Sequence, residues 1–411
     1  MADLKVETDP REVGLDGDRL ARIDRHFERY VDDGRLPGWL IAVTRHGRLA
    51  HLSTYGRRDI ENDLPVELDT VFRIFSMTKP ITSVAAMMLY EEGAFELTDP
   101  ISRFIPSFRD VKVYRSGSAI NPTLEPASEP FRVWHLLTHT AGLTYGFHHA
   151  HPVDTMYRNA GFEWGTPSGA DLAACCDAWA GLPLLFQPGR EWNYSVSTDV
   201  LGRVVEVASG QSLDEFFRER ILGPLGMTST GFSLDEADKE RLAALYVPEP
   251  GSRKAVRFDP LGAVASTRPT FLSGGGGLVS TARDYLRFAD MLRRGGELDG
   301  VRLLGPRTVA YMASNHLPGG FDLESIGRPL FAETTFDGVG FGLGFSVVTD
   351  SVKNRVLSGN GEFGWGGAAS TAFWVDPVED VTAVFLTQLL PSSTHPIRSQ
   401  LKGLVTQAIV D

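Results

Sequence analysis

The stretch TVFRIFSMTKPITSVAAMMLY, residues 70–90, sets the interpretation of the whole chain. Its first six residues are rich in β-branched and aromatic side chains and predict a strand, and the residues from Pro80 onward predict a helix with proline in its first turn. Ser76 and Lys79 stand between them, three residues apart and therefore on one face of the helix. Because a serine hydroxyl needs a neighbouring group to take its proton, this pair predicts a nucleophile and its base.

The same spacing occurs a second time, at Ser399 and Lys402. A motif with two fixed residues recurs by chance in a chain of this length, so its surroundings decide its meaning. No strand pattern precedes the second copy, which lies inside an amphipathic C-terminal segment. We therefore interpret Ser399 and Lys402 as surface residues and assign the chemistry to the first copy.

Composition limits the classes of function. The 411 residues are 42% hydrophobic and 22% charged, which predicts a large core and about two lobes. A formal net charge of −12 argues against binding to nucleic acid or to anionic membranes. No apolar run is long enough to cross a bilayer, and the polar N-terminus lacks the apolar core of a signal peptide. Together with two adjacent cysteines, Cys175 and Cys176, this predicts a cytoplasmic protein without a membrane partner.

Hydrophobic periodicity divides the chain into strand-rich ends and a helical middle. We expect strands at 39–44, 49–55, 341–348, 355–358, 369–375 and 382–389, and helices at 17–33, 131–138, 169–180, 198–208, 212–221 and 281–294. The sequence therefore predicts an α/β lobe built from residues 1–105 and 271–411, with a mostly helical lobe, residues 106–270, inserted between them. A cleft between two such lobes is a common location for an active site.

Tyr194 lies on a predicted loop just before a helix that begins near Ser197. A hydroxyl on such a loop can point into the cleft, where it can act as a general base beside a lysine. A buried tyrosine with a satisfied hydroxyl is the commoner outcome for an isolated tyrosine. The functional interpretation of Tyr194 therefore depends on the elements around it.

Two adjacent glycines, Gly366 and Gly367, follow Trp365 at the start of a predicted strand. Glycine allows a ligand to approach the backbone closely, although a glycine pair at such a place more often forms a β-bulge. The N–H of Ala368 could then pair with the N–H of Ser76 as an oxyanion hole, which stabilises the charge that develops in acyl transfer.

These three elements, in this order and spacing, resemble those of the serine β-lactamase and penicillin-binding-protein superfamily, in which the S-x-x-K signature carries the nucleophile. The resemblance extends over nearly the whole chain. It includes the stretches LLTHTAGL (136–143), YSVSTDVLGRVVE (194–206), GGGGLVSTARD (274–284) and TAFWVDP (371–377). Within the superfamily the chain is most similar to family VIII carboxylesterases, esterases that resemble class C β-lactamases.

The resemblance implies a β-lactamase-like fold of the α/β (α+β) class. Such a fold has an antiparallel sheet flanked by helices, with the active site in the cleft beside the inserted helical lobe. The resemblance also implies that Ser76 is acylated and that Lys79 and Tyr194 share the roles of base and proton shuttle. It implies no metal and no cofactor.

By the same resemblance, Trp365 borders the acyl site, with Gly366 and Gly367 beside it in the substrate-binding region. Class C β-lactamases carry Lys-Thr-Gly at this place, and they carry Tyr-x-Asn at the tyrosine element, where this chain has Val196. The missing lysine would bind the carboxylate of a β-lactam, and the missing asparagine would hold its side-chain amide. A neutral ester needs neither contact, so these departures favour an esterase.

Other features carry less functional weight. His135 and His139 have a metal-like spacing, but they lack the glutamate of an H-E-x-x-H motif. The glycines at 274–277 lack the lysine of a phosphate-binding loop and are expected to pack against the helix of the nucleophile. His148 is expected to be solvated, and Asp199 to be a charge in the first turn of a helix.

We therefore expect a serine hydrolase that cleaves short-chain carboxylic esters through an acyl-enzyme on Ser76, with a small-molecule ester as its partner. One group of alternatives cleaves amides: a β-lactamase, a D-aminopeptidase or a D,D-carboxypeptidase. Another is an acyltransferase, which would use the same acyl-enzyme, and the last is a non-catalytic protein that keeps the fold. Hydrolysis and acyl transfer need identical catalytic groups, so the sequence leaves both open, as it does the natural ester and the oligomeric state.

Overall fold

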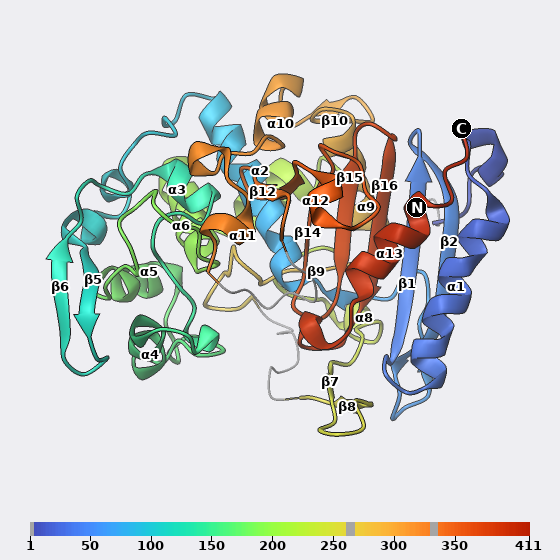
Figure 1. Cartoon of the computed structure of the whole chain (residues 1–411), viewed down its shortest axis with the longest axis horizontal. Helices are drawn as coiled ribbons and strands as arrows, with labels where there is room; N and C mark the ends of the chain where they lie inside the picture. The colour runs from blue at the N-terminus through green and yellow to red at the C-terminus, as the bar shows by residue number, and fades with distance from the viewer. Residues whose placement is uncertain (1–3, 260–267, 329–335) are drawn as a thin grey trace.

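The computed structural model describes residues 4–259, 268–328 and 336–411, and it is built around one antiparallel sheet (Figure 1). Eight strands follow one another in the order β12-β13-β14-β15-β16-β1-β2-β3. Their bounds are β1 (Gly38–Arg45), β2 (Arg48–Asp59), β3 (Leu64–Pro65), β12 (Val339–Phe341), β13 (Ser346–Val348), β14 (Phe363–Gly366), β15 (Ala372–Asp376) and β16 (Val381–Thr387). Every neighbouring pair is antiparallel, so the prediction of an antiparallel sheet is confirmed.

Strand β1 joins the two ends of the chain, because it pairs with β2 on one side and with β16 on the other. All of its residues are buried, since helices cover both faces of the sheet. Trp39 and Ile41 belong to a core shared with α1 and α13, whereas Leu40 and Ala42 point into a core shared with α2 and α9. These covering helices are α1 (Gly17–Asp32), α2 (Thr78–Glu91), α9 (Ala282–Arg293) and α13 (Ile397–Thr406).

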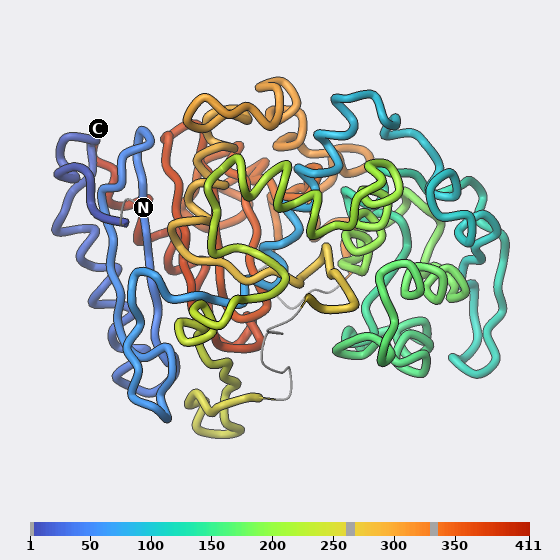
Figure 2. The backbone as a smooth tube through the Cα atoms, turned by 180° about the vertical axis from the view of Figure 1, so that it is seen from behind, coloured from blue at the N-terminus to red at the C-terminus, as the bar shows by residue number. Residues whose placement is uncertain are grey.

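A second group of elements lies to one side of the sheet and is mostly helical, with the hairpin β5–β6 at its far end (Figures 1 and 2). The bounds are α3 (Val133–Leu137), α4 (Pro152–Asn159), α5 (Leu172–Ala180), α6 (Ser197–Ser209), α7 (Leu213–Phe217), β5 (Lys112–Gly117) and β6 (Pro122–Pro126). Tyr246, near the end of the predicted inserted lobe, instead lies in the core beneath the sheet and forms a bridge with Leu389. The division at residues 105 and 270 stays a prediction.

The remaining elements are short. They are α8 (Glu236–Lys239), α10 (Pro306–Met312), α11 (Leu323–Ile326), α12 (Ser351–Asn354), and the strand pairs β4 (Phe72–Arg73) with β9 (Val279–Ser280), β7 (Tyr246–Pro248) with β8 (Ala255–Arg257), and β10 (Glu297–Leu298) with β11 (Val301–Arg302).

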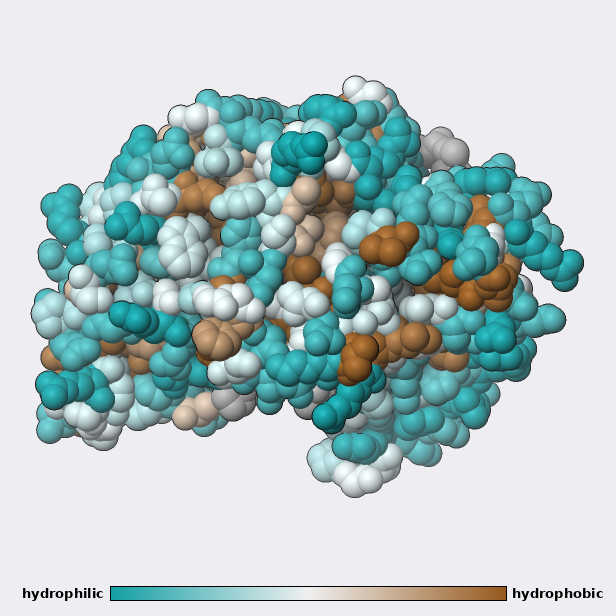
Figure 3. Space-filling view, turned by 45° about the horizontal axis from the view of Figure 1, so that its top comes forward, coloured by the Kyte–Doolittle hydropathy of each residue, from teal (hydrophilic) through white to brown (hydrophobic). Residues whose placement is uncertain are grey.

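Helix α2 runs between the sheet and the helical group, and its residues from Thr78 to Leu89 are all buried. Its apolar residues share one core with Val200 and Val204 of α6. The helix is therefore buried on all sides, and its buried polar residues, such as Lys79 and Thr82, form hydrogen bonds to neighbouring segments. None of the helices in the described residues is both long and apolar enough to span a membrane. The face drawn in Figure 3 is mainly hydrophilic, with its apolar residues gathered in separate patches.

Three strand predictions differ from the structure. The single strand expected at 341–348 is instead divided into β12 and β13, which pair with each other on either side of residues 342–345. Residues 70–75 supply only the two-residue strand β4, because the chain bends into a 3-10 turn that begins at Phe75. The predicted strand at 355–358 is wrong, since Arg355 takes a left-handed conformation at the end of α12. The strand that pairs at the sheet is β14, which carries the Trp-Gly-Gly element.

Candidate active site

The candidate nucleophile stands on a strained turn. Phe75 has a φ of 43°, a left-handed conformation that residues with side chains rarely adopt, and Ser76 follows it directly. Tyr285 stabilises the turn, because its hydroxyl donates a hydrogen bond of 2.8 Å to the carbonyl of Met77. Strained backbone persists only where surrounding contacts fix it, and it concentrates at functional sites.

Lys79 lies one helical turn beyond Ser76 and is only 2% exposed. Its amine nitrogen is 3.3 Å from Ser76 Oγ, so the structure brings the two residues of the motif together. The same nitrogen is 3.2 Å from the hydroxyl oxygen of Tyr145 and 2.7 Å from the carbonyl oxygen of Gly275. An amine with these three partners can, in its neutral form, donate two hydrogen bonds and accept the third from the serine.

Tyr145 is a partner of the amine that the sequence reasoning missed. Burial raises the pKa of Tyr145 well above its usual range, and the Asp199 carboxylate raises it further, so the phenol stays protonated. Its hydroxyl can therefore anchor Lys79 but cannot act as a base near neutral pH. The signal in the sequence was its position, two residues after the LLTHTAGL stretch and on the loop that follows.

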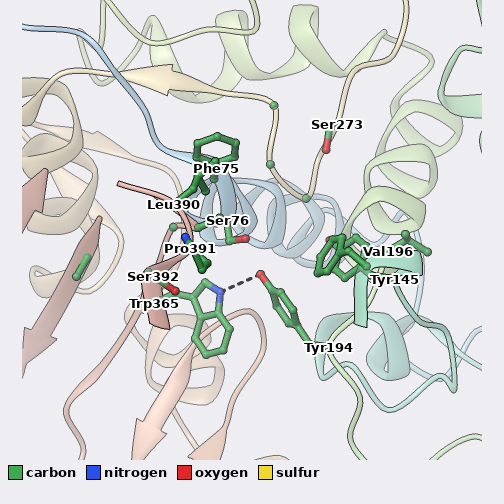
Figure 4. Close-up of a pocket in the computed structure, with 18 of the residues that line it drawn as sticks. Phe75, Ser76, Tyr145, Tyr194, Val196, Ser273, Trp365, Leu390, Pro391 and Ser392 are labelled. Carbon is green, nitrogen blue, oxygen red and sulfur yellow. Dashed lines mark hydrogen bonds between the residues drawn. The ribbon is translucent and has the colours of Figure 1, made fainter. Parts of the chain in front are cut away.

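Tyr194 points its hydroxyl toward Trp365 across the cleft (Figure 4). The indole Nε1 of Trp365 donates a hydrogen bond of 3.3 Å to that hydroxyl. The amine of Lys79 lies 4.4 Å from the centre of the Tyr194 ring, so the lysine faces the ring. The structure thus gathers Ser76, Lys79 and Tyr194 in one place, and their catalytic roles stay predictions.

His148 supports Tyr194 from the loop that carries Tyr145. Its Nε2 lies 2.7 Å from the carbonyl oxygen of Tyr194 and donates to it. The residue is partly buried, and burial lowers its pKa. The expectation that His148 is solvated is therefore wrong, because the histidine fixes the backbone that presents the candidate base.

A glycine-rich loop supplies the carbonyl that receives the lysine. Thr82 of α2 donates a hydrogen bond of 2.7 Å to the carbonyl of Gly274, so residues 274–277 pack against the helix of the nucleophile as predicted. A Cβ at Gly275 would lie 2.6 Å from a carboxylate oxygen of Asp199, so this position has no room for a side chain. Only glycine fits at position 275, because the backbone there lies very close to the Asp199 carboxylate.

Asp199 orients this loop, which the interpretation as a first-turn charge did not anticipate. The residue is in the first turn of α6, but it is only 3% exposed. Its carboxylate accepts hydrogen bonds from the hydroxyl of Ser273 at 2.6 Å and from the N–H of Gly275 at 2.9 Å. Burial raises the pKa of Asp199, and the nearby Lys79 opposes that shift.

The Trp-Gly-Gly element reaches the nucleophile through backbone contact. A Cβ at Gly367 would lie 2.4 Å from the carbonyl oxygen of Ile74, so the end of β14 passes directly beside the turn of the nucleophile. Ala368 and Phe75 pack against the same small apolar cluster. The backbone of Ala368 therefore lies beside the turn of the nucleophile, and its pairing with the Ser76 N–H as an oxyanion hole stays a prediction.

The second copy of the serine–lysine spacing has a different environment. The Lys402 amine pairs with the carboxylate of Glu362, which is only 2% exposed, so the expectation of a plain surface lysine is wrong. Ser399 donates a hydrogen bond of 3.2 Å to the carbonyl of Pro396 in its own helix. Because these two side chains bond to separate partners, the geometry supports assigning the chemistry to Ser76.

His135, just before the LLTHTAGL stretch, and His139, within it, serve the fold. His135 accepts a hydrogen bond of 2.9 Å from the N–H of Arg132, and burial lowers its pKa to about 3. His139 lies 3.2 Å from Ser195 Oγ, and its ring packs 5.0 Å from that of Tyr194. In the part of the chain that the structure describes, no group of three histidine, cysteine or acidic side chains is placed to hold a metal ion.

One cavity of about 1110 Å³ connects these groups. Ser76, Tyr145 and Tyr194 form part of its wall, as do Val196 and the Trp-Gly-Gly element (Figure 4). Val196 and Trp365 thus line the cavity where the sequence comparison with class C β-lactamases places an asparagine and a lysine. The arrangement offers a serine, an adjacent amine and a large apolar space.

A family model described as Beta-lactamase matches residues 23–407. The chain belongs to the Beta-lactamase family. Protein Rv1367c of Mycobacterium tuberculosis (strain ATCC 25618 / H37Rv) is 38% identical over 399 residues, which cover 95% of this chain and 94% of that protein. Esterase EstB of Burkholderia gladioli is 33% identical over 399 residues, which cover 92% of this chain and 93% of that protein.

A solved structure of the same fold is that of EstCE1, described as a hydrolase with promiscuous acyltransferase activity. It superimposes with a TM-score of 0.77 at 28% identity, over 96% of this chain and 99% of that chain. These relatives confirm the resemblance to the Beta-lactamase family and to its esterase branch. They also confirm the β-lactamase-like fold, in which an antiparallel sheet is flanked by helices.

Proposed function

We propose that this member of the Beta-lactamase family is a serine carboxylesterase that hydrolyses small-molecule esters through an acyl-enzyme on Ser76. The observation that carries the proposal is the buried amine of Lys79, 3.3 Å from the Oγ of Ser76, a serine that lines the cavity. The similarity to Esterase EstB supports the choice of substrate class.

In the first step, the serine is activated and attacks. Neutral Lys79 donates one N–H to the Gly275 carbonyl and one to the Tyr145 hydroxyl, which leaves its lone pair for the proton of Ser76. Ser76 Oγ then bonds to the ester carbonyl carbon, and the carbonyl oxygen becomes an oxyanion. The N–H groups of Ser76 and Ala368 are the proposed donors to that oxyanion.

In the second step, the oxyanion collapses and the bond from carbon to the alcohol oxygen breaks. The leaving oxygen takes a proton through Tyr194, whose own hydroxyl hydrogen is free for this because its oxygen accepts from Trp365. The proton that Lys79 removed from Ser76 replaces it. Water then attacks the acyl-enzyme by the same route, which releases the acid and restores Ser76.

Two positions in the lining of the cavity, Val196 and Trp365, favour an ester over a β-lactam. Val196 and Trp365 offer neither an amide nor an ammonium group, and each missing polar contact of this kind costs about 1–3 kcal/mol of substrate binding. Amide hydrolysis, as by a β-lactamase or a D-peptidase, is therefore the less favoured outcome.

Acyl transfer is the second candidate function. The cavity is large enough to hold an alcohol acceptor beside the acyl-enzyme, and EstCE1 is described as having such an activity. The two functions differ only in what attacks the acyl-enzyme, so a product assay with added alcohol measures their ratio.

The proposal is tested with initial rates on p-nitrophenyl acetate, butyrate and octanoate, beside the β-lactam nitrocefin. Ser76→Ala is expected to lower ester turnover on the order of 10³-fold or more, because only binding and the oxyanion donors remain. Ser314→Ala, at an exposed serine that does not line the cavity, is the matched control and is expected to retain activity. Ester turnover that survives in Ser76→Ala, or nitrocefin turnover that exceeds ester turnover, would contradict the proposal.

A further inference from the structure

The cavity around Ser76 is larger than a short-chain ester requires. Its volume of about 1110 Å³ lies above the range of roughly 300–1,000 Å³ that is typical of pockets for drug-sized ligands. Besides the groups at the nucleophile, its lining includes Phe162, Trp179 and Phe271. The size and the aromatic lining together indicate a substrate with a large apolar group.

Three aromatic rings form a continuous stack along this cavity. The rings of Tyr145 and Phe147 are 4.5 Å apart and 18° from parallel, and those of Phe147 and Trp164 are 5.0 Å apart and 13° from parallel. At the inner end, the Tyr145 hydroxyl contacts Lys79. At the outer end, Trp164 is 60% exposed while still lining the cavity. The stack therefore leads from the catalytic amine to solvent.

The loop that carries the two inner rings is fixed by a buried carboxylate. Asp154 is fully buried and accepts a hydrogen bond of 2.8 Å from the hydroxyl of Thr144 at the start of the loop. It also accepts from the N–H groups of Ala150 and His151 at the end of the loop, at 2.9 and 2.8 Å. Tyr145 and Phe147 are thus held in place before any ligand binds.

The loop that carries Trp164 is in turn fixed to the first loop. A Cβ at Gly146 would lie 2.2 Å from the carbonyl oxygen of Phe162, so the two backbones touch. His149 Nε2 also lies 3.3 Å from a carboxylate oxygen of Glu163, which links the same two loops. A binding surface held in this way loses little conformational entropy when a ligand binds, which increases affinity.

We infer that the aromatic stack of Tyr145, Phe147 and Trp164 binds a large, flat, neutral apolar group of the substrate, aromatic or fused-ring, while the ester carbonyl lies at Ser76. This inference rests on the proposed esterase function and names its substrate class. The three stacked side chains carry no charge, so the surface selects for shape and apolar area. The group can belong to the acid or to the alcohol of the ester, and the experiment distinguishes the two.

The test compares kcat/KM for ethyl acetate with that for two larger esters, measured by acid release. 2-Naphthylmethyl acetate enlarges the alcohol, and ethyl 2-naphthylacetate enlarges the acid. The wild type is expected to prefer at least one naphthyl ester, and Trp164→Ala to lower that preference about tenfold, the scale of one lost aromatic contact with its buried area. The naphthyl ester whose preference falls in Trp164→Ala shows whether the acid or the alcohol of the substrate lies on the stack.

Two further variants sharpen the result. Trp164→Phe keeps a ring on Phe147 and is expected to recover most of the preference. Tyr311→Ala removes an aromatic ring that is 48% exposed on α10 and is not among the residues that line the cavity, and it is expected to change nothing. An unchanged preference in Trp164→Ala, or an equal loss on ethyl acetate, overturns the inference. Failure of the proposed function looks different, since no ester would then show turnover that depends on Ser76.

Discussion

The two walls of the cavity are built in different ways. The catalytic wall, residues 74–79, 273–278 and 366–368, is held by backbone placed against backbone and by glycines that leave no room for side chains. The aromatic wall, Tyr145, Phe147 and Trp164, consists of side chains on two surface loops. Tyr145 belongs to both walls in effect, because its hydroxyl contacts Lys79 while its ring begins the stack.

Because the two walls are built differently, substitutions in them should have different effects, on the reaction in one case and on the choice of substrate in the other. Positions of the catalytic wall are constrained by contacts of less than about 3 Å, so most substitutions there move the reacting groups. The rings of Phe147 and Trp164 can be exchanged without moving Ser76 or Lys79, and we expect such exchanges to alter binding alone. We expect the catalytic wall to set the rate and the aromatic wall to set specificity, and three substitutions test this division.

The largest effect is expected from Tyr194→Phe, which removes one hydroxyl and keeps the packing of the ring. Loss of general acid–base help lowers kcat on the order of 10²–10⁴-fold. Tyr145→Phe is the matched comparison, since the Tyr145 hydroxyl anchors Lys79 and stays protonated, and its loss is expected to cost only about tenfold. Steady-state kinetics on p-nitrophenyl butyrate measure both. A Tyr194→Phe variant within tenfold of wild type would remove Tyr194 from the mechanism.

An intermediate effect is expected from Gly367→Ala. The new Cβ would meet the carbonyl oxygen of Ile74 at 2.4 Å, so the backbone that carries the N–H of Ala368 must shift. Loss of one oxyanion donor lowers kcat about 10²-fold, with KM little changed. Gly403→Ala in α13, where nothing lies within 4 Å, is the control and should leave both constants intact. Full activity of a folded Gly367→Ala variant would show that the catalytic wall tolerates substitution after all.

The smallest effect is expected from Trp365→Ala, at the boundary between the two walls. The indole lines the cavity and also donates to Tyr194, so both the rate and the acyl-chain preference should change by less than about tenfold. Trp365→Phe keeps the ring and loses the donor, which separates the two contributions. Rates on p-nitrophenyl acetate, butyrate and octanoate measure the acyl-chain preference. An unchanged profile in Trp365→Ala would show that this side chain does not border the acyl group.

Features that depend on local spacing were predictable from the sequence, and features that depend on distant contacts were not. Ser76 and Lys79 meet because a helix places residues three apart on one face. Tyr145 contacts Lys79 from a loop, and Asp199 of α6 binds the N–H of Gly275, whose carbonyl receives the lysine. These contacts join residues far apart in the sequence, so no local pattern predicts them. The strand expected at 355–358 was wrong for a related reason. The segment that pairs between β13 and β15 is β14, and such pairing depends on neighbours across the sheet that are distant in the sequence.

The pairing of β1 with β16 also affects how the protein is synthesised. Trp39 lies opposite Thr387, so an apolar strand made early must wait for a partner made almost last. At about 5–20 residues per second, translation leaves that strand edge open for tens of seconds. We therefore expect the nascent chain to need protection by chaperones, and slower growth at low temperature to raise its soluble yield. Ala368 is also translated late, so we expect the candidate site around Ser76 to be completed only after most of the chain has been made.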